Sequence, residues 1–139
     1  MTTSRSAGAP IDLAATPIHL GLGATAEVLP PFDGTTEWYG RYSADTSADG
    51  PEGRLVSWHT FDAPWDSWEM HPHGHELVVC VNGTATLVQE LPDGATHTVT
   101  LSPGEAAVNP PGVWHTMDVV GSAAALFVTA GSGTEHRPR

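Results

Sequence analysis

Three histidines and two glutamates lie within residues 68–76, where the sequence reads WEMHPHGHE. Imidazole nitrogens and carboxylate oxygens together suit divalent Fe, Mn, Ni, Cu or Zn, whereas structural zinc sites usually recruit several cysteines. This chain has a single cysteine, Cys80. The stretch therefore predicts one divalent transition-metal ion that serves function rather than folding.

Residues far apart in the chain can complete such a site. His71 and His73 would share one face of an extended strand, because alternate residues of a strand point the same way. His115 is the best remote candidate, since the rigid turn of residues 110–112 fixes where its strand begins. With Glu76, these histidines are the predicted metal ligands, and Glu76 is also the predicted catalytic carboxylate. Two alternating histidines alone are more often solvated or packed than bound to metal, so the prediction depends on the combination.

Other residues leave alternatives open. His75 is an alternative to Glu76 as the fourth ligand, or a loop residue that hydrogen-bonds its own backbone. Glu69 has the strand parity of His71 and His73, so it is either a carboxylate that orients an imidazole or an exposed edge residue. The remaining histidines have no partner visible in the sequence and are interpreted as structural or solvated: His19, His59, His97 and His136.

Three of the five tryptophans, Trp65, Trp68 and Trp114, bracket the predicted site. Burial in a core or an interface is the favoured interpretation, and an aromatic wall around a small organic ligand is the alternative. Cys80 lies in the apolar run of residues 77–81, which predicts a small buried hydrophobic residue and not a nucleophile.

Length and charge restrict the class of protein. A chain of 139 residues fits one domain with its own hydrophobic core. The formal net charge is −11, with five arginines and no lysine, which argues against binding to nucleic acid or to an anionic membrane. Residues 1–32 contain no apolar run long enough for a signal peptide or a membrane span, so we expect a cytoplasmic protein.

Short β-prone runs separated by turn residues predict an all-β fold, a small antiparallel barrel or jelly roll of about eight to ten strands. Asn82-Gly83 is typical of a tight hairpin turn, and no segment shows a sustained helical period. Residues 1–25 are interpreted as an N-terminal arm, residues 26–139 as the domain, and residues 43–53 as a surface loop. The predicted strands are residues 55–61, 68–73, 77–81, 84–90, 96–101, 106–109, 116–120 and 124–129.

Two segments resemble the two sequence motifs of the cupin superfamily. In the family, the second motif is Gly, five residues, Pro, one residue, Gly, two residues, His, three residues and Asn. It is matched by Gly104, Pro110, Gly112 and His115, with Val119 in the place of Asn.

The first cupin motif has two histidines around one residue, then three or four residues, a Glu, six residues and a Gly. It is matched by His71, His73, Glu76 and Gly83, with two residues between His73 and Glu76. The resemblance covers roughly residues 55–129. It implies a single-domain cupin jelly-roll barrel and the metal ligands His71, His73, Glu76 and His115, but no particular reaction.

Three functions remain as hypotheses. The first is a metal-dependent enzyme, of dioxygenase or isomerase type, that acts on a small organic molecule. The second is a non-catalytic module that binds or senses a small ligand or a metal. The third is a metal-free sugar epimerase, which we rank last because only Arg41 and Arg54 lie within the body of the chain to bind a pyrophosphate. We expect a homodimer, for which Ile18, Leu20 and Leu22 are candidate contacts.

Overall fold

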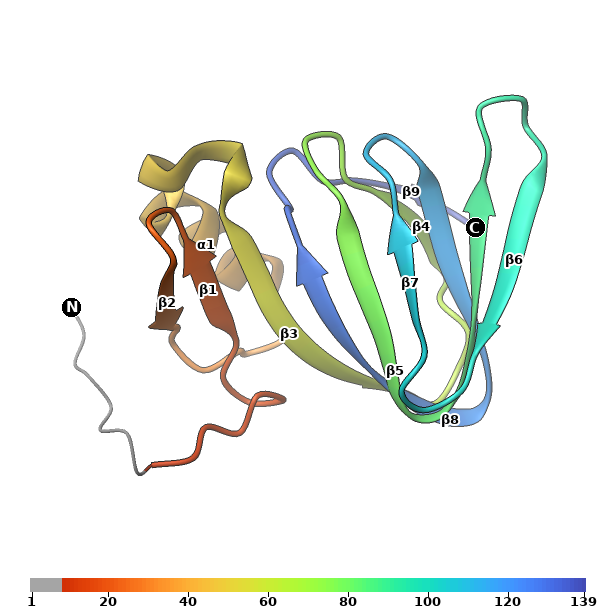
Figure 1. Ribbon diagram of the computed structural model, residues 1–139, viewed down its shortest axis with the longest axis horizontal. Coiled ribbons are helices and arrows are strands. Elements are labelled where there is room, and N and C mark those ends of the chain that lie inside the picture. Colours follow the sequence, from red (N-terminus) through yellow and green to blue (C-terminus); the bar gives the residue numbers. More distant parts are fainter. Residues whose placement is uncertain (1–8) are drawn as a thin grey trace.

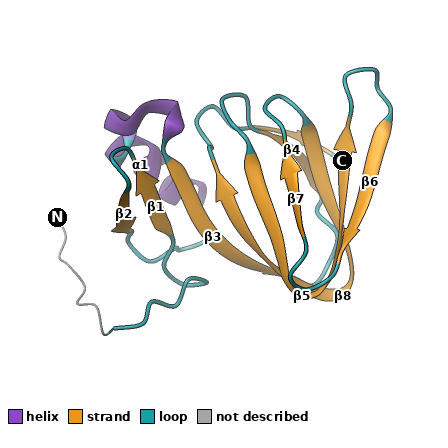
Figure 2. Cartoon of the chain, viewed as in Figure 1, coloured by secondary structure: helices purple, strands orange, loops and turns teal. Residues whose placement is uncertain are grey.

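The protein folds as a jelly roll built on one nine-stranded antiparallel sheet, as the sequence predicts (Figures 1 and 2). The computed structural model describes residues 9–139. In the described residues no helix is long and apolar enough to cross a membrane. The elements are β1 (Ile18–Gly21), β2 (Thr25–Val28), α1 (Thr36–Asp45), the 3-10 helix η1 (Ser47–Glu52), β3 (Arg54–Phe61), β4 (Ser67–Met70), β5 (Glu76–Glu90), β6 (Thr96–Leu101), β7 (Ala106–Asn109), β8 (Trp114–Thr129) and β9 (Glu135–Pro138).

The two longest strands, β5 and β8, pair with each other along most of their length. Each of them covers two strands that the sequence analysis predicts as separate. The prediction of a hairpin turn at Asn82-Gly83 is wrong, because β5 continues through these residues with two register shifts against β8. Gly83 has a φ of 73° and lies so close to the backbone carbonyl of Ser122 that a Cβ atom would clash. The positive φ angle of Gly83, which a tight hairpin turn would also require, here forms part of a β-bulge.

A large part of the barrel interior is an apolar core, whose residues alternate along the strands with outward-facing residues. Cys80 and Leu87 on β5 are fully buried, as is Met117 on β8, whose Cα is opposite that of Leu87. The prediction of Cys80 as a small buried hydrophobic residue is confirmed. The main core cluster consists of Val78, Cys80, Ala85, Leu87, Leu101, Met117, Val119, Ala123, Ala125 and Phe127.

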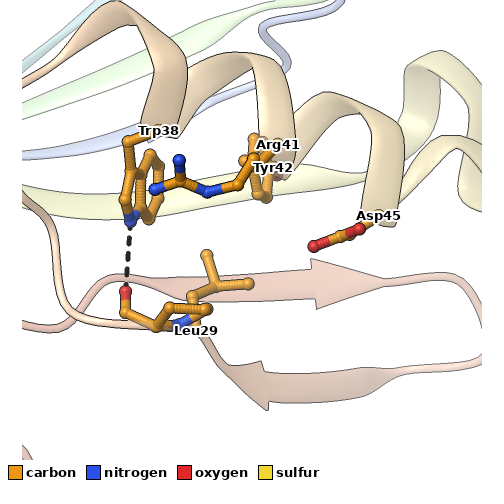
Figure 3. A pocket seen from close by; sticks show the side chains of 6 residues that line it. Leu29, Trp38, Arg41, Tyr42 and Asp45 are labelled. Atoms are coloured by element: carbon orange, nitrogen blue, oxygen red, sulfur yellow. Dashed lines mark hydrogen bonds between the residues drawn. The ribbon is translucent and has the colours of Figure 1, made fainter.

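A helical segment lies at one end of the sheet, beside β1 to β3 (Figure 1). The sequence predicts no helix and a loop over residues 43–53, and both expectations are wrong. The side chain of Thr35 caps α1 by accepting a hydrogen bond from the Trp38 backbone N–H, at 3.2 Å. Trp38 is 3% exposed, and its indole N–H donates to the carbonyl of Pro30 (Figure 3). The burial of Trp38 against Leu29 therefore stabilises α1, although the sequence of α1 has no strong helical periodicity of apolar residues.

The predicted N-terminal arm is partly built into the sheet. β1 lies within it and pairs with both β2 and β3. Leu20 and Leu22 remain 37% and 48% exposed. Residues 1–8 of the arm lie outside the described residues, and the domain boundary at residue 25 stays a prediction.

Candidate metal centre

Four side chains meet inside the barrel: Glu69, His71, Glu76 and His115. Each offers one ligand atom, and these atoms all lie within 4.8 Å of one another. Glu69 lies on β4, opposite His115 on β8, while Glu76 begins β5. His71 directly follows β4, and its carbonyl accepts a hydrogen bond from the N–H of Gly112. That bond ties the turn of residues 110–112 to the first histidine and so brings the two distant motifs together.

Glu76 is held rigidly by hydrogen bonds to both of its oxygens. The amide of Asn109 donates to Oε1 at 3.0 Å, and the hydroxyl of Thr129 donates to Oε2 at 2.6 Å. Gln89 fixes Asn109 in turn, with its amide 2.8 Å from Asn109 Oδ1. Burial alone would raise the pKa of Glu76, but the imidazoles of His115 and His71 outweigh burial and lower it well below its usual range. The carboxylate is therefore ionised and oriented.

One hydrogen bond orients the ring of His71. The hydroxyl of Thr134 donates to the carbonyl of Gly131, so it acts as the acceptor for His71 Nδ1–H, at 2.7 Å. This hydrogen bond leaves Nε2 as the ring nitrogen that faces the cluster. Nε2 lies 3.2 Å from Glu76 Oε2 and is buried without a hydrogen-bond partner. The ring of His71 is thus oriented so that Nε2 is the nitrogen that could bind a metal.

His115 is 1% exposed, and neither of its ring nitrogens has a hydrogen-bond partner. Its Nε2 lies 3.2 Å from Glu76 Oε1 and 3.7 Å from Glu69 Oε1. Burial would lower its pKa, but the carboxylates of Glu69 and Glu76 outweigh burial and raise the pKa to about 9. Two ligand atoms that each lie about 2.1 Å from one ion are separated by about 3.0–3.4 Å, so the 3.2 Å separations fit a shared cation.

Glu69 joins the cluster from its more exposed side. Its side chain is 27% exposed, and its Oε1 is 3.9 Å from His71 Nε2. Its other oxygen, Oε2, lies 3.0 Å from Nε2 of His136 on β9. Burial would raise the pKa of Glu69, but His115 and His136 lower it to about 2. Glu69 is thus a charged side chain that could close onto an ion with a small shift.

Three of the four predicted ligands are brought together, and the fourth, His73, is not. β4 ends at Met70, before Pro72, so the alternation that would put His71 and His73 on one face stops between them. The imidazole of His73 is exposed and lies beside Gly133, and His75 is exposed as well. The fourth member of the cluster is instead Glu69, two residues before His71. A ligand role for His73 stays a prediction.

A cavity of about 740 Å³ opens beside the cluster and includes Glu69, His71 and Glu76 in its wall. Three histidines interpreted from the sequence as structural or solvated also line it: His19, His59 and His136. His59 has the same parity on β3 as Phe61, which is the signal that could have identified it. Burial lowers the pKa of His59, which makes it a neutral imidazole in the cavity wall. Trp65 also lines the cavity.

The segment after β8 supports the cluster from outside. Thr134 holds His71, and His136 holds Glu69. Arg137 fixes the segment, because its guanidinium lies 4.5 Å from the ring centroid of Trp114 and 5.3 Å from that of Trp68. The sequence assigns no chemistry to these residues, because the contacts depend on the pairing of β9 with β4.

Thr134 provides a test of this support. Thr134→Val removes the hydroxyl but keeps the shape, so His71 loses the acceptor that orients its ring. We expect the affinity for a divalent ion to fall about 10-fold or more, the usual cost of losing such an outer partner. Thr134→Ser should restore it, as measured by competition with a chromophoric chelator. Equal affinities for the valine variant and the natural protein would contradict this role.

The comparisons with known proteins agree with this architecture. A family model described as "Cupin domain" matches residues 58–131, which is more than half of the chain. The chain therefore belongs to the cupin family. No curated protein matches it by sequence. Thr134 and His136 lie beyond the matched residues.

Several solved structures are similar to part of this chain. A mutant of oxalate decarboxylase from Bacillus subtilis has 15% identity and a TM-score of 0.52, over 69% of this chain and 26% of that one. A cupin superfamily protein from Desulfitobacterium hafniense has 19% identity and a TM-score of 0.46, over 55% of this chain and 65% of that one. Hydroquinone 1,2-dioxygenase from a Sphingomonas species has 13% identity and a TM-score of 0.45, over 53% of this chain and 57% of that one. This chain therefore spans less than two thirds of each of these proteins, and the similarity concerns the fold alone.

Proposed function

We propose that this cupin is a metal-dependent enzyme of dioxygenase or isomerase type that acts on a small organic molecule. The observation that carries the proposal is the convergence of two buried imidazoles and two carboxylates, whose ligand atoms all lie within 4.8 Å of one another, beside a cavity of about 740 Å³. The Mn(II) centres of Bacillus subtilis oxalate decarboxylase, which has the same fold, are consistent with a divalent ion here.

The residues present fit a divalent transition-metal ion. His71, Glu76 and His115 would hold it, with Glu69 as the fourth side chain. When bound, the ion would supply Lewis-acid or oxygen chemistry to a substrate in the cavity. Asn109 and Thr129 keep the carboxylate of Glu76 oriented.

The cavity wall contributes two further effects. His59 is a neutral imidazole there, which can accept a proton from a bound molecule. Phe61 and Phe127 pack on the core and give part of the cavity wall an apolar surface for a ligand.

The first experiment is elemental analysis of protein purified without an affinity tag. We expect about one divalent transition-metal ion per chain, and its redox capacity chooses between oxygen chemistry and isomerisation. Removal of the ion by a chelator should abolish turnover, and the same ion should restore it. Turnover that persists in the metal-free protein would refute the proposal. Tight binding of a ligand that stays unchanged after long incubation with the loaded protein would favour the binding module instead.

The choice between Glu69 and His73 as the fourth ligand is a separate prediction. Because Glu69 lies in the cluster and His73 is exposed, we expect Glu69→Gln to lower metal affinity about 10- to 100-fold. His73→Ala should leave affinity nearly unchanged. Isothermal titration with Mn(II) or Zn(II) measures both variants. The reverse order of effects would reinstate His73, as the cupin motif implies.

We also propose that the chain forms a homodimer. β2 is at the edge of the sheet, and next to it β1 carries the exposed Leu20. An unpaired strand edge with apolar neighbours favours pairing with a second copy. Light scattering should give twice the mass of one chain at micromolar concentration, and a monomer mass would contradict the proposal.

A further inference from the structure

A hydrogen-bonded triad lies in the wall of the cavity, apart from the metal centre. His19 on β1 is 3% exposed, and its Nε2 lies 2.6 Å from Oδ2 of Asp49 on η1. Its Nδ1 lies 2.7 Å from the hydroxyl oxygen of Tyr42 on α1. His19 and Tyr42 line the cavity, whereas Asp49 does not. One buried imidazole therefore connects a hydroxyl in the cavity wall to a carboxylate outside that wall.

The direction of each hydrogen bond in the triad follows from Asp49. The hydrogen bond from His19 lowers the pKa of Asp49, so its carboxylate is ionised and can only accept. The proton of the neutral imidazole then lies on Nε2, and Nδ1 accepts from the Tyr42 hydroxyl. Because that hydroxyl donates its only proton to His19, Tyr42 offers oxygen lone pairs to a hydrogen-bond donor on a ligand.

Two glycines allow the triad to pack closely. A Cβ atom on Gly53 would lie 2.7 Å from Cε1 of His19, and a Cβ atom on Gly21 would lie 2.8 Å from Oδ2 of Asp49. The backbone N–H of Leu22 also donates to Oδ1 of Asp49, at 3.4 Å. The imidazole and the carboxylate are thus held in one geometry before any ligand binds, which favours proton transfer.

The triad and the metal centre lie on one row of the inner face of the sheet. The row consists of consecutive cross-strand partners that all line the cavity: His19, Leu55, Thr129 and Glu76. Neighbouring strands lie about 4.8 Å apart, so His19 is separated from Glu76 by about 14 Å along the sheet. The triad is therefore a separate polar group in the same cavity.

The acidity of imidazole restricts the ligands from which this triad can take a proton. An imidazole accepts protons from weak acids whose pKa lies near its own, about 6.5. Carboxylic acids have already lost their proton near neutral pH, and aliphatic alcohols hold theirs too strongly. Phenols and enols lie between these classes. Burial raises the pKa of Tyr42 to about 12, so Tyr42 does not keep the ligand's charge and passes a proton on to His19.

We propose that Tyr42, His19 and Asp49 form a second site in the cavity, which binds a weakly acidic hydroxyl group, as in a phenol or an enol, and takes its proton. The O–H bond of the ligand breaks as a new O–H bond forms on the Tyr42 oxygen. The original proton of Tyr42 passes to Nδ1 of His19. The ligand becomes a phenolate or an enolate that accepts a hydrogen bond from Tyr42, and the carboxylate of Asp49 stabilises the imidazolium. This step needs no metal ion, so the inference goes beyond the proposed metal chemistry.

Para-nitrophenol is a direct probe of this site. Its acidity is close to that of imidazole, and its phenol and phenolate forms absorb at different wavelengths. Absorbance and isothermal titrations are made on protein from which a chelator has removed the metal, so that no ion can ionise the probe. At a pH slightly below the pKa of the free probe, we expect the bound probe to absorb as the phenolate. A bound probe that stays neutral, or no measurable binding, would overturn the proposal.

Substitutions in the triad show whether it causes the ionisation. Tyr42→Phe keeps the ring that stacks on Trp38 and removes only the hydroxyl. It should weaken binding of the probe about 10-fold, the effect of losing one hydrogen bond to a charged group, and leave the bound probe neutral. Asp49→Asn keeps the Tyr42 hydroxyl but removes the charge behind His19, so the probe should still bind, as the neutral phenol. Phenolate absorbance that persists in both variants would contradict the proposal.

Tyr39→Phe is the matched control. Tyr39 lies on the same helix and lines the same cavity, but it is not part of the triad. Its substitution should change neither the affinity for the probe nor the absorbance of the bound probe. Equal effects of Tyr39→Phe and Tyr42→Phe would contradict the proposal, because the effect would then not depend on the link to His19.

Two further measurements separate this proposal from other sources of ionisation. The titrations are repeated on the metal-loaded protein, and a phenolate that appears only there would assign the ionisation to the ion and overturn the role of the triad. Loss of the phenolate in His59→Gln but not in Asp49→Asn would assign the proton to His59 and overturn it as well. A chain that binds no metal but ionises the probe would refute the metal-dependent enzyme and support the triad.

Discussion

Glu76→Gln is expected to remove most metal binding while the barrel stays folded. The substitution keeps the size of the side chain, and its carbonyl can still accept from Asn109 at the position of Oε1. It removes the negative charge that lies 3.2 Å from the Nε2 atoms of both His71 and His115. Loss of a charged ligand should lower affinity by more than about 100-fold, beyond the usual cost of losing an outer partner. Isothermal titration with Mn(II) or Zn(II) measures the metal affinity, and circular dichroism measures whether the barrel stays folded.

Glu27→Gln is the matched control for this prediction. Glu27 lies on β2, is exposed, and is far from the cluster in sheet order. The same loss of one charge from a chain of net charge −11 should leave metal affinity unchanged there. Similar losses for both variants would mean that affinity follows overall charge. A Glu76→Gln protein that binds metal as tightly as the natural chain would remove Glu76 from the site.

The spacing of residues in the sequence predicts three members of the cluster, His71, Glu76 and His115. Each of them lies where a strand begins or ends. His115 follows the turn of residues 110–112, and the proline and glycine residues of this turn determine the geometry of the turn. The backbone N–H of Gly112 donates a hydrogen bond to the carbonyl of His71. Such local rules can be derived from residue types alone. The jelly roll and most strand positions followed in the same way.

The remaining features depend on tertiary contacts. The exchange of His73 for Glu69 depends on where β4 ends, and strand ends are the least certain feature of a sequence-based assignment. α1 depends on the burial of Trp38 against residues from other elements. Asn82-Gly83 favours positive φ, but the choice between a turn and a bulge is made by pairing with β8. The roles of Thr134 and His136 arise only once β9 lies beside β4.

Leu87→Ala should produce the largest loss of stability in the barrel. Leu87 is 0% exposed and belongs to the main core cluster, opposite Met117. Truncation of a buried leucine removes apolar burial and leaves a cavity, at a cost of about 2–5 kcal/mol in the free energy of unfolding. This is a large fraction of the roughly 5–15 kcal/mol that stabilises a typical domain. Urea denaturation of the metal-free protein measures the change without a contribution from bound metal.

Leu77→Ala is the same substitution on the same strand and separates burial from strand propensity. Leu77 is 37% exposed on β5, so its truncation should cost less than about 1 kcal/mol. If both substitutions cost the same, β5 would be stabilised by its backbone pairing and intrinsic strand preference rather than by the core. The expected difference instead makes stability a property of the apolar interior. The carboxylates and imidazoles of the metal centre could then change, as in Glu76→Gln, without unfolding the barrel that positions them.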